Sequence, residues 1–284
     1  MKDIRTIGIC APSSYVERED IDAAAALMEA RGYKVIIHPQ AFERHGQLAG
    51  TAVQKIDALH ALYKNPEIDV IWAAGGGNRA LSIIDDLNYD LIAAHPKPMI
   101  GFSDVTALLN AITVKTGIAN IHGPVFKNLP KHKELDSLLA HDFSMPLDNA
   151  CILGNGEASG TLYGGNLSVF QYLPETLGLD FLNGAILFLE DCNEEISRID
   201  RMFLHLKRLG VFDRISGLIL GQFHALQDSA RPFGLTLEDI VAEHLNVRDI
   251  PIIMDAPFGH GNDLHPLPVG MNAKITQNKV EITD

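Results

Sequence analysis

In the first half of the chain, short apolar runs alternate with longer segments whose apolar residues recur every three or four positions. The apolar runs predict buried strands at 6–12, 33–39, 68–77 and 98–102, and the periodic segments predict helices at 18–32, 51–65, 79–87 and 104–117. In the helix expected at 51–65, the stripe runs through Val53, Ile56, Leu59 and Tyr63. This alternation predicts a parallel sheet with helices on both faces, and ligands bind such sheets at the carboxyl ends of the strands.

The pattern changes in the second half. Turn-forming residues dominate 141–160, and beyond them we expect strands at 184–191, 215–223 and 250–255, a long amphipathic helix at 193–210 and a terminal hairpin at 271–284. We therefore predict an N-terminal domain over 1–145, a linker over 146–158, and a smaller, strand-rich C-terminal domain over 159–284.

Composition and charge exclude several classes of protein. Of the 284 residues 46% are hydrophobic, which suits a folded core, and the formal net charge of −13 makes nucleic acid and anionic membranes poor partners. Three scattered cysteines do not form a disulfide framework or a cysteine-based metal site. With no signal peptide at the N-terminus and no run of eighteen apolar residues, we expect a cytoplasmic protein.

The first candidate for chemistry is Ser103, at the switch from the strand at 98–102 to the following helix. A serine at this point can simply cap the helix. It can also be a nucleophile on a sharp strand-to-helix turn, with the N–H of Asp104 ready to hold an oxyanion. Gly101 provides one of the two small positions of the hydrolase motif Gly-x-Ser-x-Gly, but Val105 stands at the other.

A second candidate is the glycine run Gly75–Gly77, in the segment AAGGGNRAL. Glycines let a backbone approach a ligand closely and leave N–H groups for an anion. The spacing matches neither a dinucleotide fingerprint nor a P-loop, so nucleotide binding is disfavoured. The run is either a tight turn or the second half of an oxyanion hole beside Ser103.

The remaining candidates lie in the second half. Glu190 ends an apolar strand and could orient a histidine, as the acid of a serine triad does, or cap the next helix. The loop 255–270 contains His260 between two glycines, a plausible general base. A metal site on that loop would use its histidines and aspartates, namely Asp255, His260, Asp263 and His265, but their spacing fits no familiar ligand pattern.

Seven segments in order give the chain a resemblance to the LD-carboxypeptidase family of serine peptidases, which includes muropeptide carboxypeptidases and microcin C immunity peptidases. They are GICAPSS, AAGGGNRAL, IGFSDVTALLNA, IHGPVF, YGGNLSV, LFLED followed by SRIDRMF, and FGHGNDLHPLPVG. The resemblance implies a flavodoxin-like, doubly wound N-terminal domain and a smaller, β-rich α+β C-terminal domain.

It also implies residue roles. Ser103 would be the nucleophile, His260 the base and Glu190 the acid that orients it, with the N–H groups of Asp104 and of Gly77 or Gly76 as the oxyanion hole. The implied reaction needs no metal or cofactor. It releases the terminal D-alanine from the L-centre of meso-diaminopimelate in cytoplasmic murein tetrapeptides, and the implied assembly is a homodimer. Arg79, Asn166 and Arg198 are our candidates for substrate binding; Arg201 also follows the acid strand.

Alternatives remain open at this point. The immunity-type members hold an aromatic ring against a nucleotide base, and the only tryptophan here, Trp72, falls in an expected strand of the first domain. Tyr163, Phe170 or Tyr172 could stack instead, so hydrolysis of peptidyl- or aminoacyl-adenylate amides is a second hypothesis. A metal-dependent hydrolase and a non-catalytic protein that binds a small ligand are the hypotheses from other classes.

Overall fold

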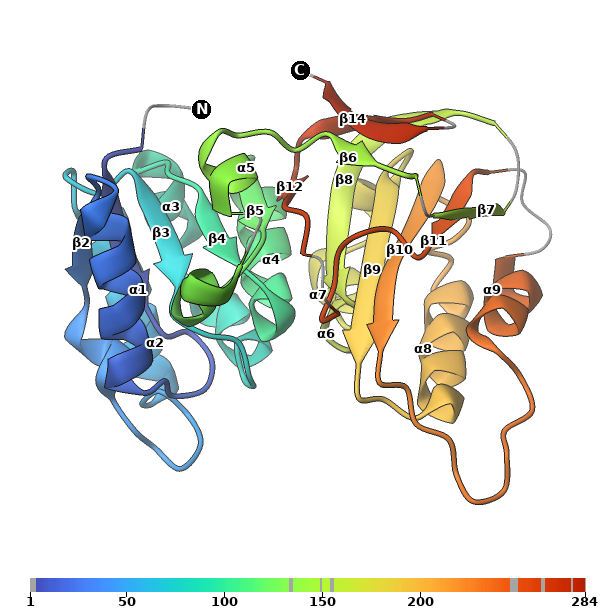
Figure 1. Ribbon diagram of the computed structural model, residues 1–284, viewed down its shortest axis with the longest axis horizontal. Coiled ribbons are helices and arrows are strands. Elements are labelled where there is room, and N and C mark those ends of the chain that lie inside the picture. The colour runs from blue at the N-terminus through green and yellow to red at the C-terminus, as the bar shows by residue number, and fades with distance from the viewer. Residues whose placement is uncertain are drawn as a thin grey trace. The chain divides into compact units, whose positions relative to one another are not determined.

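The structure, a computed structural model, describes residues 4–132, 135–148, 150–153, 156–245, 250–261, 264–276 and 278–283. The chain forms two compact units (Figure 1). The first contains Met1–Asp142 and Pro266–Gly270, and the second contains Phe143–His265 and Met271–Asp284. Each is described in turn.

The first unit is a six-stranded sheet with helices on both faces (Figure 1). Its strand order is β12-β5-β4-β3-β1-β2, and β1 to β5 pair in parallel. The strands are β1 (Thr6–Cys10), β2 (Lys34–Ile37), β3 (Val70–Ala73), β4 (Met99–Gly101), β5 (Asn120–His122) and β12 (Leu267–Val269). The order confirms the doubly wound, flavodoxin-like prediction. The late strand β12 adds an antiparallel edge to β5, so Pro266–Gly270 lies in the first unit although we predicted 159–284 as one C-terminal domain.

The helices of this unit are α1 (Arg18–Ala30), α2 (Ala52–Lys64), α3 (Tyr89–Ala94), α4 (Thr106–Thr116) and α5 (Leu135–Leu139). The segment expected as a short helix at 79–87 is instead a 3-10 helix, η2 (Leu81–Asp86). It lies between Ala80, whose N–H donates to Asp104, and Asn88, which caps α3.

The predicted stripe on α2 is wrong at its first member, because Val53 is 66% exposed. The buried positions of this helix are Lys55, Ala58, Leu59, Leu62 and Tyr63. They follow the spacing of one helical face, and a lysine occupies its first position.

The second unit is built on a mixed eight-stranded sheet in the order β6-β14-β13-β8-β9-β10-β11-β7. Its strands are β6 (Met145–Pro146), β7 (Cys151–Leu153), β8 (Ala158–Asn166), β9 (Ile186–Cys192), β10 (Gly217–His224), β11 (Ile252–Met254), β13 (Asn272–Ile275) and β14 (Lys279–Thr283). The central strands β8 to β11 are parallel, and the terminal hairpin β13–β14 is antiparallel as predicted. The turn-rich stretch expected as a linker supplies the two edge strands, β6 and β7.

Helices complete this unit. They are α6 (Leu167–Phe170), α7 (Leu173–Leu177), α8 (Ile196–Arg208) and α9 (Leu237–Leu245). The apolar face of α8 buries Ile199, Met202, Phe203 and Leu206. The mixture of a large sheet with helices agrees with the predicted β-rich α+β class.

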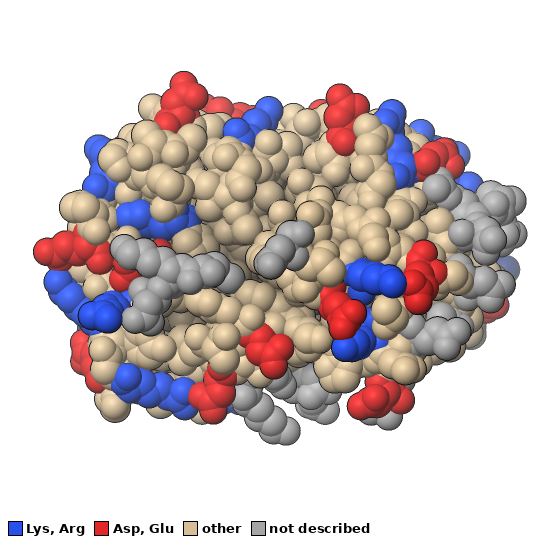
Figure 2. Space-filling model, turned by 90° about the horizontal axis from the view of Figure 1, so that it is seen from above, with Lys and Arg blue, Asp and Glu red and all other residues tan. Residues whose placement is uncertain are grey.

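Charge is spread rather than gathered on the face seen in Figure 2, where Lys and Arg lie among Asp and Glu. In the described parts of the chain we find no helix with the length and apolar character that a bilayer span requires.

Candidate active site

Ser103 lies directly after β4, where the chain turns into the 3-10 helix η3 (Ser103–Val105) and then α4. Its backbone is left-handed, with φ of +61°, a conformation that non-glycine residues seldom adopt. Gly101 is required two positions earlier, since a Cβ there would lie 2.4 Å from Cγ1 of Val105. The N-cap position of η3 belongs to Phe102, so Ser103 is the first residue of this 3-10 helix and not its cap. The serine is held on a sharp, strained turn, a geometry typical of a nucleophile.

The glycine run after β3 approaches this turn closely. A Cβ added to Gly76 would lie 3.1 Å from Cβ of Ser103 and 3.5 Å from its Oγ, so only glycine lets the backbone come this near. Gly77 has φ of +123° and is packed against Ser14. Within the described chain, the N–H groups of Gly76 and Gly77 donate no hydrogen bond. They are available to an anion beside Ser103.

The side chain of Asp104 links the turn after β4 to the segment that follows the glycine run. Its carboxylate is buried and accepts a hydrogen bond of 2.8 Å from the N–H of Ala80. Burial raises the pKa of Asp104, while this bond and the charge of Lys55 act in the opposite direction. The N–H of Asp104 lies in the first helical turn, where backbone donors lack partners inside the helix. The side chain of Asp104 is thus structural, and its N–H suits an oxyanion.

In the second unit, the structure brings Glu190 and His260 together. Glu190 lies in the buried part of β9 with no exposed surface, and its Oε2 lies 2.6 Å from Nδ1 of His260. The imidazole is partly open, with 22% of the side chain exposed. A buried carboxylate on Nδ1 orients the ring and stabilises a proton on it, the arrangement in which Nε2 is the nitrogen that transfers protons in a serine triad.

The glycines on either side of His260 have a packing role. A Cβ on Gly259 would lie 2.8 Å from the carbonyl oxygen of Gln222, and one on Gly261 would overlap the side chain of Gln222. The N–H of Gln222 also bonds to the carbonyl of Phe258 at 2.7 Å. This loop is therefore held tightly against β10, which fixes the backbone that carries the imidazole.

Asn166 occupies a position that we did not predict. Its amide Nδ2 donates to Oε1 of Glu190 at 3.3 Å and to Oδ1 of Asp191 at 3.1 Å, and its Oδ1 accepts from the hydroxyl of Ser168. Asp191 also accepts the N–H groups of Ser168 and Cys192. We expected Asn166 at the substrate; in this structure its amide holds the second oxygen of Glu190.

The ionisable groups of this cluster have displaced pKa values. Burial acts to lower the pKa of His260, but hydrogen bonds with Cys192 and Glu190, together with their charges, outweigh it and raise the pKa to about 10. Burial raises the pKa of Asp191 to about 6, helped by the charge of Glu190. The imidazole therefore binds a proton strongly, and it becomes a base only when the surroundings or the pH remove that proton.

The other predicted residues fall in varied environments. The guanidinium of Arg79 is exposed beside the glycine run. Arg198, in the first turn of α8, pairs with Glu194, which precedes this helix, at 3.2 Å. Trp72 is buried in β3, and its indole N–H donates to the carbonyl of Pro124 at 2.7 Å, so it cannot stack on a ligand.

The three aromatic alternatives to Trp72 also differ. Phe170 is completely buried, Tyr163 packs edge-on against Phe181 with ring centres 5.0 Å apart, and Tyr172 is 48% exposed. Of the proposed metal loop, Asp263 lies outside the described residues. No group of three potential metal ligands occurs in the described ranges.

Sequence reasoning missed four residues around these sites: Lys55, Ser168, Asp191 and Cys192. A signal existed for Asp191, which follows Glu190 at a strand end, and for Lys55, which precedes Leu59 by one helical turn on a buried face.

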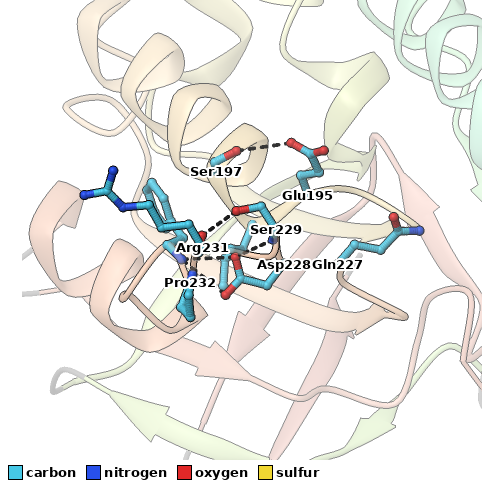
Figure 3. A pocket seen from close by; sticks show the side chains of 9 residues that line it. Glu195, Ser197, Gln227, Asp228, Ser229, Arg231 and Pro232 are labelled. Atoms are coloured by element: carbon cyan, nitrogen blue, oxygen red, sulfur yellow. Dashed lines mark hydrogen bonds between the residues drawn. The ribbon is translucent and has the colours of Figure 1, made fainter.

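A cavity of about 290 Å³ opens in the second unit between the start of α8 and the loop after β10 (Figure 3). The carboxylate of Asp228 accepts the N–H of Phe233 at 3.0 Å and that of Ser229 at 2.7 Å, and the side chain of Arg231 points away from it. The polar groups of this loop bond to one another, and no predicted site residue lines the cavity.

Two family models match this chain, one in each half. Residues 7–123 match the LD-carboxypeptidase N-terminal domain and residues 159–275 match the LD-carboxypeptidase C-terminal domain. A probable murein peptide carboxypeptidase of Bacillus subtilis is 31% identical, over 98% of this chain and 90% of that protein. The murein tetrapeptide carboxypeptidase of Pseudomonas aeruginosa is 29% identical, over 96% and 94%.

A solved structure extends the likeness to the fold. MccF, the microcin C7 self-immunity protein of Escherichia coli, has been solved in complex with glutamyl sulfamoyl guanosine. It superimposes with a TM-score of 0.87 at 25% identity, over all of this chain and 97% of that one.

Proposed function

We propose that this chain, which belongs to the LD-carboxypeptidase family of peptidases, works as a serine peptidase with Ser103, His260 and Glu190 as its catalytic triad. The observation that carries the proposal is the pairing of the buried Glu190 with the partly exposed His260, whose Oε2 and Nδ1 atoms lie 2.6 Å apart. The left-handed turn at Ser103, with Gly76 against it, supports the nucleophile.

In the proposed reaction, Ser103 Oγ attacks the amide carbonyl while Nε2 of His260 takes its proton. The N–H groups of Asp104 and of Gly76 or Gly77 hold the oxyanion of the tetrahedral intermediate. The intermediate collapses as His260 gives its proton to the leaving amine. Water, deprotonated by His260, then attacks the acyl-enzyme and releases the acid product. No step uses a metal or cofactor, so activity should survive exhaustive chelation.

The proposed substrate is a murein tetrapeptide, cleaved between the L-centre of meso-diaminopimelate and the terminal D-alanine. Support comes from the names of the Bacillus and Pseudomonas relatives. Incubation with L-Ala-γ-D-Glu-meso-diaminopimelate-D-Ala should release D-alanine, detected by mass spectrometry, and Ser103→Ala should reduce the rate by four to six powers of ten, roughly. Equal release by both proteins would reject Ser103 as the nucleophile.

A second candidate is the hydrolysis of aminoacyl-adenylate amides, favoured by the likeness to MccF. Here Tyr172 is the most exposed of the three candidate aromatic rings. If the tetrapeptide is inert and an aminoacyl-adenylate amide is cleaved by the wild type but not by Ser103→Ala, the serine mechanism stands and the substrate proposal falls.

Three further proposals rest on the family resemblance. The nucleophile belongs to a functional domain over 1–145, and the acid and base belong to a domain over 159–284 after the connecting stretch 146–158. The enzyme acts in the cytoplasm and forms a homodimer. Fractionation of cells and light scattering of the purified protein test the last two.

A further inference from the structure

A cavity in the first unit is lined, among the described residues, by basic side chains and by no acidic one. It measures about 230 Å³ and lies between the start of α2 and the segment that follows the glycine run. Lys55, Arg79 and His45 line it, and none of its lining residues is acidic. Leu48 and Ile83 add an apolar wall.

Lys55 is the unusual member. The residue is only 2% exposed, although lysine is seldom buried without a partner. Within the described ranges, its ammonium has no hydrogen bond and no ion pair. Burying an ammonium in this way is unfavourable unless another group satisfies it. The charge of the buried Asp104 favours the ammonium, but Asp104 forms no hydrogen bond or ion pair with it in the described chain, so the lysine that lines this cavity can still bind an anionic ligand.

Arg79 provides a second cation at the other wall. Its backbone has φ of +80°, and its guanidinium likewise makes no hydrogen bond or ion pair in the part of the chain that is described. Burial lowers the pKa of Lys55, and the charge of Arg79 adds to this, while Asp104 acts in the opposite direction. Each of these cations disfavours the charged form of the other, and an anion bound between them would favour the charged form of both.

The cavity is close to the proposed chemistry. Arg79 follows Gly76 by three residues, which limits their Cα separation to about 11 Å. Gly76 touches Ser103, and the N–H of Ala80, directly after Arg79, bonds to Asp104. A carboxypeptidase must recognise a free carboxylate near the scissile bond, and a guanidinium fork with an ammonium suits that group.

We propose that Lys55 and Arg79 bind the C-terminal carboxylate of the substrate's departing D-amino acid, with Leu48 and Ile83 beside its small side chain. The proposal rests on the proposed carboxypeptidase function for its substrate. It assigns a specificity role to Lys55 and gives a structural basis to the role we expected for Arg79.

The kinetic test compares the tetrapeptide with its C-terminal carboxamide. Lys55→Met and Arg79→Gln should each lower kcat/KM for the acid about tenfold to a hundredfold, the usual range for a lost charged hydrogen bond, and leave the amide unaffected. Lys55→Arg should retain most of the preference for the acid. Lys64→Met, an exposed lysine on the same helix, is the matched control and should behave as wild type. Equal losses on acid and amide would overturn the proposal.

A binding test separates this proposal from the proposed function. Calorimetric titration with N-acetyl-D-alanine should show binding that its amide lacks, and that Lys55→Met and Arg79→Gln lose. If the tetrapeptide is not hydrolysed but this pattern appears, the anion site stands without the peptidase. If acid and amide titrate alike, the anion site is refuted even in an active peptidase. Arg79 is exposed, so its variant keeps the test valid if Lys55→Met does not fold.

Discussion

Replacement of Glu190 by glutamine tests the coupling between the acid and the base. The side chain keeps its shape, and its amide oxygen can still accept from Asn166. Its NH₂ group, however, would face Nδ1 of His260 and favour the tautomer that carries the proton on Nε2. That nitrogen could then no longer accept a proton from Ser103. By analogy with the loss of the acid in serine proteases, we expect kcat to fall about 10⁴-fold.

The same substitution should change how stability depends on pH. In the wild type, the pKa of His260 is raised from 6.5 to about 10, which corresponds to at most about 5 kcal/mol. Because the folded-state pKa is the higher one, this stabilisation is fully present below pH 6.5 and is lost as the pH rises to about 10. The free energy of unfolding should thus decrease by up to about 1.4 kcal/mol per pH unit across that window from this group.

Urea unfolding of wild type and Glu190→Gln between pH 6 and pH 10 measures the effect, since other titrating groups cancel in the difference. The variant should show a shallower decline. Glu195→Gln, an exposed position nearby, is the matched control and should follow the wild type. Parallel curves for wild type and Glu190→Gln would refute the coupling and with it our explanation of the raised pKa of His260.

Three other substitutions test the geometry around the site. Ser103→Gly should abolish peptidase activity yet raise the free energy of unfolding by up to about 1 kcal/mol, because it relieves a left-handed serine; lower stability in urea unfolding would argue against strain. Gly101→Ala should lower the free energy of unfolding by about 1–3 kcal/mol through its clash with Val105. Adding Val105→Ala should recover part of that loss in the same assay, and no recovery would show that the clash with Val105 is not the cause. Cys192→Ala should lower the pKa of His260, so the rise of kcat/KM with pH should move to lower pH; an unmoved profile would show that the thiol does not affect the base.

The first unit could be predicted almost completely from its sequence, because hydrophobic period and turn residues agree along it. The exceptions are instructive. The spacing of Val53 matches the apolar stripe predicted for α2, but its side chain is exposed to solvent. The buried face of this helix starts two residues later, at Lys55. A hydrophobic pattern assigns polar residues to the surface by default, so it cannot reveal a lysine that is buried to meet a ligand.

The second unit was less predictable because its sheet depends on distant pairings. The strand β12 belongs to the first unit's sheet, and β6 and β7 close the edges of the second, although all three are only two or three residues long. Such short segments have no clear period, and their pairing is decided by tertiary contacts.

At the candidate site, too, local sequence indicated the residues but not the contacts between distant segments. Glu190 and His260 were candidates from their places in the sequence, and the family resemblance implied their roles, but their pairing at 2.6 Å is a structural fact that spacing in the sequence does not give. The contacts of Asn166 could not be predicted for the same reason. Its neighbours Glu190 and Asp191 lie 24 and 25 residues away in sequence, and only the parallel pairing of β8 with β9 brings them together.

The most direct test of the central proposal asks whether Ser103 and the Glu190–His260 pair act as one catalytic unit. It measures kcat/KM for D-alanine release by Ser103→Ala, by Glu190→Gln and by the double variant. Members of a triad are strongly non-additive, so the double variant should be no slower than Ser103→Ala alone. If instead the two losses multiply, the serine and the pair work independently, and the proposed triad is contradicted.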